Sequence, residues 1–472
     1  MFYIKIILLF IGFRRLYMSE QSVIKSKVMI DMVSKNPIED GAVIFEDGLI
    51  TLSGNYEKIK NKIRSDAKIY DYNDSVLIPG MVDCHTHHNG FGDGRSGDSI
   101  GEMEDNILTI KSAKNAKTSL FSGVTTIREN GPKNVTMMKL RDAVNQGLAI
   151  APRMVLCGRP IAIIGGHMGY FGGEVTGPVE SLALSRQLIK EGVDYFKITA
   201  TGGSTATSFP LRPSFSQKEL DAVTNEAKNY GLLTATHCLS MEGIDNSLNS
   251  GVDMIIHCNF DNEKGESKFN EKLAEKIAKK GAYVNPTLHV GRARLWSLEE
   301  GNNPSLGGGE KRTYDETKQV LDKKRLSSAI RSDRKDILEA RLDAAKLGLE
   351  NKLDHCRRMI DMGLKVITGS DSSWGDYSLG NTFHETELLV ESGYSNYEGL
   401  KSVTINAAMA LGLGDTAGSI EKGKSADFAI LKNNPLDDIK NLSSVEEVFL
   451  MGQHIERGSD ESNKTYSQIK PA

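Results

Sequence analysis

Eight short apolar segments, each ending in polar residues, recur along this 472-residue chain and constrain its fold more than any other feature. They end at residues 83–87, 122–130, 154–160, 194–203, 232–238, 253–260, 283–288 and 365–373. Helical stretches such as Gln217–Tyr230 and Glu271–Lys280 separate them, which is typical of parallel βα units. The pattern predicts an α/β protein built on a (β/α)8 TIM barrel, with its chemistry at the carboxyl ends of the strands. A doubly wound sheet is the alternative, disfavoured because no glycine-rich dinucleotide fingerprint opens the first unit.

Both ends of the chain carry strand patterns of a different kind. Residues 23–33 partly alternate apolar and polar side chains, as a half-buried strand does. Residues 42–52 are typical of a hairpin with Asp47 and Gly48 at its turn. After about residue 416 strand patterns return in AGSIEKGKSADFAIL and VEEVFLMGQHI. We therefore expect the two ends of the chain to share one small β-sandwich domain.

These patterns divide the chain into a composite domain and a barrel. Residues 19–78 plus 416–472 would form the β-sandwich domain, and residues 79–415 the catalytic barrel. The connection between the last two barrel strands, at about residues 291–364, is too long for one helix and rich in charge. Long inserts of this type are often lids or assembly surfaces. Residues 1–18 are interpreted as a disordered or mis-started extension.

Composition excludes several classes of protein. The 58 Lys and Arg residues against 62 Asp and Glu give a net charge of −4, which offers no basic face to a nucleic acid. Five cysteines in so long a chain do not make a disulfide framework, and this favours a reducing compartment. The apolar run at residues 6–13 is shorter than the ~20 residues of a membrane span. We expect a cytoplasmic homo-oligomer that binds neither nucleic acid nor membrane and acts on a small molecule or short peptide.

The first barrel strand ends in a pair of histidines with metal-ligand spacing. Alternate residues on a strand point to the same side, so His85 and His87 would both face the barrel mouth. Two imidazoles on one face are a natural pair of metal ligands. His88 would point elsewhere and is left out. His-x-His alone is a weak signal, and its weight comes from the strands that follow.

Three further strands end in side chains that bind metals. His237 and His257 end the fifth and sixth strands, and Asp371 ends the eighth. Taken singly, each histidine is more often a hydrogen-bonded core or surface residue than a ligand, and an aspartate here can cap the next helix. Together with His85 and His87 they would converge on one ring of strand ends, which points to a metal site.

Lys197, at the end of the fourth strand, adds a chemical argument. It lies in Tyr195-Phe196-Lys197-Ile198, among apolar residues where a charged ammonium is costly to bury. One interpretation is a lysine whose charged end reaches the solvent. The other is a neutral amine that adds CO2 and becomes a carbamate, an anion able to bridge two metal ions ~3.5–4 Å apart.

With these six residues in this order, the chain resembles the amidohydrolase superfamily. The resemblance is to the branch of Xaa-Pro dipeptidase-like and Zn-dependent carboxypeptidase-like enzymes, which is related to imidazolonepropionase. PGMVDCHTH, SGVTTIREN, FKITATGG and GSIEKGKSADFAIL stand where that branch has its motifs, and the match runs from about Val23 to Ile455.

The resemblance implies a site for two divalent metal ions, usually zinc. His85, His87 and Asp371 would hold the more buried ion. His237 and His257 would hold the more exposed one, and carbamylated Lys197 would bridge the two. Asp371 would also take the proton of a metal-bridged water and return it to the leaving amine.

Candidate substrate contacts come from the loops after the strands. His167, in IGGHMGYFGGE, matches a histidine of this branch and is a candidate second electrophile or hydrogen-bond donor to substrate, or else a structural loop residue. Tyr170 lies where the family often has a different pattern, which leaves its substrate contact open. Arg212 and Arg292 are candidate clamps for a substrate carboxylate, the alternative being that they are solvated loop arginines.

The expected activity is hydrolysis of an amide bond in a dipeptide or N-acyl amino acid, with release of the C-terminal residue. An alternative on the same site is a small aryl amide, carbamate, urea or cyclic amide. Deamination is disfavoured, since deaminases of this superfamily typically lack the bridging lysine. A remote alternative is a non-catalytic scaffold, against which stand the six filled ligand positions.

Overall fold

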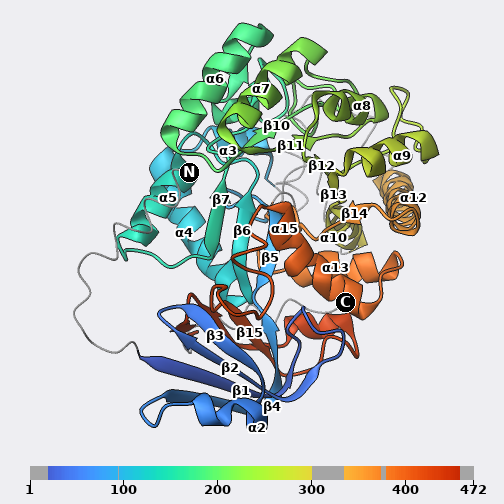
Figure 1. Ribbon diagram of the computed structural model, residues 1–472. Coiled ribbons are helices and arrows are strands. Elements are labelled where there is room, and N and C mark those ends of the chain that lie inside the picture. The colour runs from blue at the N-terminus through green and yellow to red at the C-terminus, as the bar shows by residue number, and fades with distance from the viewer. Residues whose placement is uncertain (1–19, 94, 300–333, 374–378, 458–472) are drawn as a thin grey trace.

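All eight expected barrel segments form strands in the computed structural model, which describes residues 20–93, 95–299, 334–373 and 379–457 (Figure 1). The strands are β5 (Met81–Thr86), β6 (Val124–Glu129), β7 (Arg153–Leu156), β10 (Tyr195–Ile198), β11 (Leu233–His237), β12 (Met254–Ile256), β13 (Tyr283–Asn285) and β14 (Lys365–Val366). Every pairing among them is parallel. The prediction of a parallel βα barrel is confirmed.

The barrel strands form two sheets rather than one uninterrupted ladder. One sheet has the order β5-β6-β7 and the other the order β10-β11-β12-β13-β14. An isolated parallel bridge from Ile161 to Ile198 spans one seam, and a second bridge from Thr86 to Ser372 spans the other. The carboxyl ends of all eight strands therefore face one mouth, although the ladder is not continuous around the barrel.

Helices on the outside of the barrel connect these strands. They are α4 (Asp105–Phe121), α5 (Thr136–Asn145), α6 (Gly177–Glu191), α7 (Gln217–Tyr230), α8 (Met241–Ser250), α9 (Glu271–Lys280), α10 (Leu288–Glu299), α12 (Arg334–Asp361), α13 (Thr382–Glu391), α14 (Asn396–Ser402) and α15 (Ile405–Ala410). The two helical stretches predicted from sequence, α7 and α9, have the expected bounds. A capping box of Ser216 and Glu219 begins α7, and Gly231, with a φ of 67°, ends it.

Shorter elements complete the connections. They are α2 (Tyr56–Ile59), η2 (Lys60–Lys62), α3 (Gly97–Gly101), β8 (Ala162–Ile163), η3 (Gly169–Phe171), β9 (Glu174–Val175) and η6 (Ile439–Ser443). The loop that contains β8, η3 and β9 follows the third barrel strand and carries His167. This loop is held by parallel pairing of β8 with β9.

Strands from both chain ends share one sheet, as predicted (Figure 1). Its order is β17-β16-β15-β4-β1-β2-β3, formed by β1 (Gln21–Met29), β2 (Ile38–Glu46), β3 (Leu49–Asn55), β4 (Lys68–Pro79), β15 (Phe428–Leu431), β16 (Val445–Leu450) and β17 (Gln453–Ile455). The β2–β3 turn uses positive φ at Asp47 (51°) and Gly48 (79°).

This terminal sheet curves back on itself. Its edge strand β3 meets the segment before β15 through a bridge from Leu49 to Ser425. Side chains on the inner face, among them Ile24, Phe45 and Phe428, pack into one buried cluster. The two faces of the expected sandwich are thus parts of one curved seven-stranded sheet. Strand β4 leads directly into β5, so this sheet anchors the first barrel strand.

The long connection before β14 contains two helices in its described part, α10 and the 28-residue α12. The helices α10 and α12 pack against each other, and α12 also contacts β14 and α13 (Figure 1). The glycine run at 307–309 and the proposed extension at 1–18 lie outside the described residues. Within the described ranges, no helix combines the length and apolar character that crossing a bilayer would require.

Candidate metal centre

Three buried side chains converge at the seam between β5 and the end of β14. The Oδ1 atom of Asp371 lies 3.2 Å from Nε2 of His85 and 3.0 Å from Nε2 of His87. The two imidazole nitrogens are 3.1 Å apart. All three residues are buried, and their ligand atoms lie within 4.8 Å of one another. We call this group the Asp371 corner.

The three ligand atoms of the Asp371 corner carry too few protons to hydrogen-bond with one another, which favours a bound cation. Asn285 donates its amide N–H to the carbonyl of Gly369, which leaves its Oδ1 to face Nδ1 of His85 at 3.0 Å. Nδ1 of His85 must therefore carry the proton, and its Nε2 carries a lone pair aimed at Asp371. Burial lowers the pKa of His85 well below 6.5, so this imidazole is neutral. Three donor atoms with at most one proton among them suit a divalent metal ion.

A second pair of imidazoles faces this corner from β11 and the end of β12. Nδ1 of His237 lies 2.9 Å from Nε2 of His257, and the ring centroids of His85 and His257 are 5.6 Å apart. His237 donates its Nε2 proton to the carbonyl of Gly202 at 3.0 Å, so its Nδ1 presents a lone pair. Nδ1 of His257 contacts the hydroxyl of Thr287 at 2.7 Å. We call these two residues the histidine pair.

An uncommon backbone conformation directs these side chains toward the mouth of the barrel. His257, Thr287 and Asp371 all have positive φ, at 65°, 50° and 59°, and they lie within five residues of the ends of β12, β13 and β14. Non-glycine residues seldom adopt this conformation, and clusters of it occur at functional sites. Asp371 is also tied to the first strand, because its N–H donates to the carbonyl of His85 at 2.7 Å.

Buried Asp83 holds the two strands of the Asp371 corner together. Its Oδ1 accepts the N–H groups of His85 and Ser370, each at 3.0 Å. Its Oδ2 accepts the hydroxyls of Ser370 and Thr382, each at 2.6 Å. Burial raises the pKa of Asp83, while these hydrogen bonds oppose the shift. The carboxyl group therefore fixes the spacing between β5 and the residues that follow β14.

Lys197 is buried at the end of β10 and interacts electrostatically with residues of both ligand groups. Its side chain is 1% exposed, and burial lowers its pKa to about 8 although Asp371 acts in the opposite direction. After burial itself, the charge of Lys197 is the largest influence that lowers the pKa values of His85 and His257. The sequence prediction of a buried lysine at this position agrees with the structure.

His167 reaches the same mouth from the loop after the third strand. Its ring lies 4.4 Å from that of His237, centroid to centroid, and its Nδ1 is 3.1 Å from the hydroxyl of Thr205. Gly203 is required here, because a Cβ at that position would lie 2.5 Å from Cγ of His167. Burial lowers the pKa of His167 to about 3, so the ring is a neutral hydrogen-bonding group.

Neither candidate arginine is free to clamp a substrate carboxylate, and Tyr170 packs within the loop that carries His167. Tyr170 packs edge-on against Phe171, with ring centroids 4.7 Å apart. Arg212 is exposed, and its guanidinium lies 4.5 Å from the ring centroid of Phe209. Arg292 is buried and its guanidinium donates to Glu387 at 2.9 Å. The charge of Arg292 is therefore already neutralised within the fold.

Residues next to the ligands point away from the metal centre, as strand alternation predicts. Nδ1 of His88 contacts Oε2 of buried Glu129 at 2.8 Å. Cys84, Cys238 and Cys258 are free and buried, and each belongs to a hydrophobic cluster. These three cysteines are therefore packing residues of the core rather than metal ligands.

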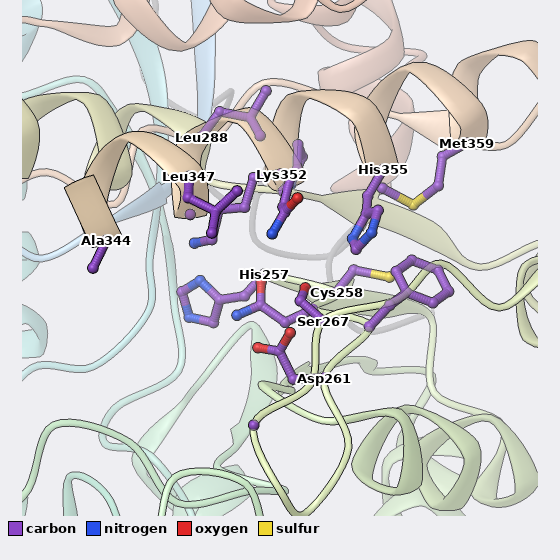
Figure 2. Close-up of a pocket in the computed structure, with 16 residues that line it drawn as sticks. His257, Cys258, Asp261, Ser267, Leu288, Ala344, Leu347, Lys352, His355 and Met359 are labelled. Atoms are coloured by element: carbon purple, nitrogen blue, oxygen red, sulfur yellow. The ribbon is translucent and has the colours of Figure 1, made fainter.

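A cavity of about 300 Å³ opens beside the histidine pair (Figure 2). Residues at 257–267, 286–288 and 344–359 line it, so the insert helix α12 forms one wall. Lys352 of α12 and His257 lie on facing sides of this cavity (Figure 2). Sequence reasoning missed Lys352, as well as Asn285 and Thr287, because none belongs to a motif and their partners are distant in the chain.

The amidohydrolase family model matches residues 76–455, and the chain therefore belongs to the amidohydrolase family. Enzymes of this family depend on metal ions and hydrolyse C–N bonds. The match covers all eight barrel strands and the metal centre. Hydrolysis of amide bonds is the chemistry that this fold and site define.

Several known proteins are similar over most of their length. A crystal structure of a Xaa-Pro dipeptidase with methionine bound in its active site superposes with a TM-score of 0.76 at 26% identity, covering 93% of this chain and 100% of the other. Ochratoxinase of Aspergillus niger is 24% identical over 439 residues, which are 86% of this chain and 80% of the relative. Imidazolonepropionase of Thermoplasma volcanium is 23% identical over 438 residues, 88% of this chain and 90% of the relative.

Proposed function

We propose that this protein uses two divalent metal ions, most simply zinc, to hydrolyse the amide bond of a dipeptide or N-acyl amino acid and release the C-terminal residue. The observation that carries the proposal is the Asp371 corner, where lone pairs of His85 and Asp371 meet at 3.2 Å beside a second pair of imidazoles. The likeness to a Xaa-Pro dipeptidase supports a peptide-like substrate.

In this proposal each group of ligands holds one ion. His85, His87 and Asp371 hold the first, and His237 and His257 hold the second. When bound, two such ions lower the pKa of a water molecule and polarise the carbonyl of the scissile amide. Asp371 accepts the proton of the attacking water and transfers it to the leaving nitrogen, which requires one carboxylate oxygen to be free of protons at the start.

Lys197 joins the two ligand groups as a carbamate. Its neutral amine attacks CO2, a C–N bond forms, and one proton is released to solvent. The burial that lowers the pKa of Lys197 to about 8 increases the fraction of neutral amine at neutral pH. The product replaces a buried cation with an anion that offers two oxygen ligands.

His167 is assigned to the substrate rather than to a metal ion. Its ring is neutral and lies beside His237, so it can donate or accept a hydrogen bond at the substrate carbonyl. Exchange of His167 for Asn should lower kcat/KM while leaving the metal content unchanged.

A second candidate substrate class is a cyclic amide, an aryl amide, a carbamate or a urea. The similarity to imidazolonepropionase over 88% of this chain supports it. The same side chains would carry out this reaction, and only the groups that line the cavity would select between the two classes.

A panel of dipeptides, N-acyl amino acids and cyclic amides tests the proposal directly. The protein is supplied with zinc, and released amine is measured for each compound. We expect turnover of compounds that end in a free amino acid and loss of that turnover after chelation. Turnover confined to cyclic amides would favour the second class, and no turnover of any amide would overturn the proposal.

A further inference from the structure

The cavity beside His257 has a mixed chemical character that points to a particular kind of ligand (Figure 2). Its apolar wall comes from Phe260, Leu288, Leu347 and Met359. Its volume of about 300 Å³ lies at the lower limit for small-molecule sites, and suits one amino-acid residue better than a large aromatic body. The cavity therefore offers an apolar side chain a place next to the metal centre.

Lys352 supplies the positive charge of this cavity. It lies on α12 and, within the described part of the chain, has no hydrogen bond or ion pair of its own. Burial lowers its pKa, while the carboxylates of Asp261, Glu385 and Asp371 act in the opposite direction. Among the described residues, Asp261 lines the same cavity but makes no direct ion pair with Lys352. A partly buried ammonium without a direct partner is costly, and an incoming anion would reduce that cost.

The arginines predicted as carboxylate clamps do not fill this role in the structure. Arg292 already donates to Glu387 and to the carbonyl of His384. Arg212 lies over an exposed phenylalanine, Phe209. Neither of them lines the cavity, whereas Lys352 does.

We propose that Lys352 binds the free carboxylate of the leaving residue of the substrate, and that the apolar wall of the cavity receives its side chain. The inference rests on the proposed amide hydrolysis and narrows it to substrates with a free C-terminal acid and an apolar last residue. Lys352 acts as a specificity-determining residue, because it recognises a group that takes no part in bond cleavage.

The test uses two compounds that differ only in the charge of their terminal group. N-acetyl-L-methionine and N-acetyl-L-methionine amide are compared by release of acetate with the zinc-loaded protein. We expect Lys352→Met to raise KM for the acid about ten- to hundredfold with little change in kcat, since a hydrogen bond to a charged group is lost. The amide should be unaffected.

Two further variants make the result specific. Lys352→Arg keeps the charge and should keep the preference for the acid. Lys346→Met changes an exposed lysine of the same helix that does not line the cavity, and it should behave like the unmodified protein. Misfolding of Lys352→Met would show as lost turnover of both compounds. The preference for the acid over the amide would then be compared between Lys352→Arg and the unmodified protein, and loss of that preference in Lys352→Arg would count against the proposal.

The outcomes separate this inference from the proposed function. Equal turnover of acid and amide by the unmodified protein, or an acid preference that survives Lys352→Met, would overturn the role of Lys352 and leave amide hydrolysis intact. If neither compound is cleaved, calorimetric binding of N-acetyl-L-methionine decides. Weaker binding to Lys352→Met would support the inference, and equal or absent binding would overturn it.

Discussion

The two halves of the metal centre differ in whether a proton is available between the atoms that face each other. In the Asp371 corner, Asn285 forces His85 to present a lone pair to a carboxylate oxygen 3.2 Å away. In the histidine pair, the lone pair of His237 lies 2.9 Å from Nε2 of His257, which is free to carry the matching proton. The histidine pair satisfies itself without a metal ion, whereas the Asp371 corner does not.

This difference shows which half depends most on a cation. Lone pairs that face each other in a buried site repel, and burial makes the repulsion stronger. A divalent ion converts the same contacts into attraction. We infer that the Asp371 corner binds its metal ion tightly and that the histidine pair binds its ion more weakly, because there the ion must displace a good hydrogen bond.

The largest effect is expected from Lys197. Lys197→Ala should abolish turnover and lower the metal content if its carbamate is the ligand that joins both ions, as we propose. A short carboxylic acid in the buffer should restore part of the activity by replacing the carbamate. Metal content is measured by atomic emission. Unchanged turnover of Lys197→Ala would contradict the proposed carbamate.

The next largest effect tests Asp371 itself. Asp371→Asn keeps the shape but removes the charge and the proton acceptor. General acid–base catalysis is worth ~10²–10⁴-fold, so kcat should fall by about that factor. A near-wild-type rate would assign the proton transfer to another group. Glu385→Gln, at another buried carboxyl whose burial raises its pKa to about 7, is the matched control for kcat.

A smaller effect on metal affinity is expected from changing the side chains that orient the imidazoles, and it should differ between the two halves. Asn285→Leu removes the acceptor that fixes His85, and outer ligands of this kind are worth about 10–100-fold in metal affinity. Thr287→Val removes the hydroxyl beside His257 in the other half. We expect Asn285→Leu to weaken the tight metal ion and Thr287→Val only the weak one. Identical effects of both variants on both ions would contradict the comparison.

Strand alternation and strand ends made much of this centre predictable from sequence. His85 and His87 follow from a period of two on one strand, and His237, His257 and Asp371 follow from the rule that chemistry lies at the carboxyl ends. Local patterns and the family motifs carry that information, so the barrel and the shared terminal sheet were also predictable.

What sequence reasoning missed depends on contacts between distant residues. Asn285 is 200 positions from His85, and no local pattern announces that one fixes the tautomer of the other. Lys352 sits in a charged insert that is typical of a solvated surface, and only the packing of α12 beside the mouth turns it toward His257. From the sequence, Arg292 was either a clamp for a substrate carboxylate or a solvated loop arginine. In the structure its charge is paired with Glu387 of another helix.

The smallest effect concerns the acid stability of the metal-free protein. Burial lowers the pKa values of His85, His237 and His257 well below 6.5, so these rings stay neutral when folded but gain protons when unfolded below pH 6.5. Unfolding then takes up protons, and stability falls as the pH drops through 6.5 and is fully present above it. At about pH 6 each histidine contributes at most about 0.8 kcal/mol of this loss.

Thermal unfolding of the chelated protein at about pH 7.5 and pH 6 measures this effect. The melting temperature should be lower at the more acid pH, and His237→Asn should reduce the difference. A melting temperature that does not change between these values would mean that the histidines are not buried as neutral rings.

Calorimetric titration of the metal-free protein with zinc tests the central claim most directly. We predict two binding events per chain, the first at least about tenfold tighter than the second, a ratio that corresponds to about 1.4 kcal/mol. His237→Asn should remove the weaker event and keep the tighter one, whereas His85→Asn should remove the tighter one. A single event, two equal events, or loss of the tighter event in His237→Asn would contradict the account.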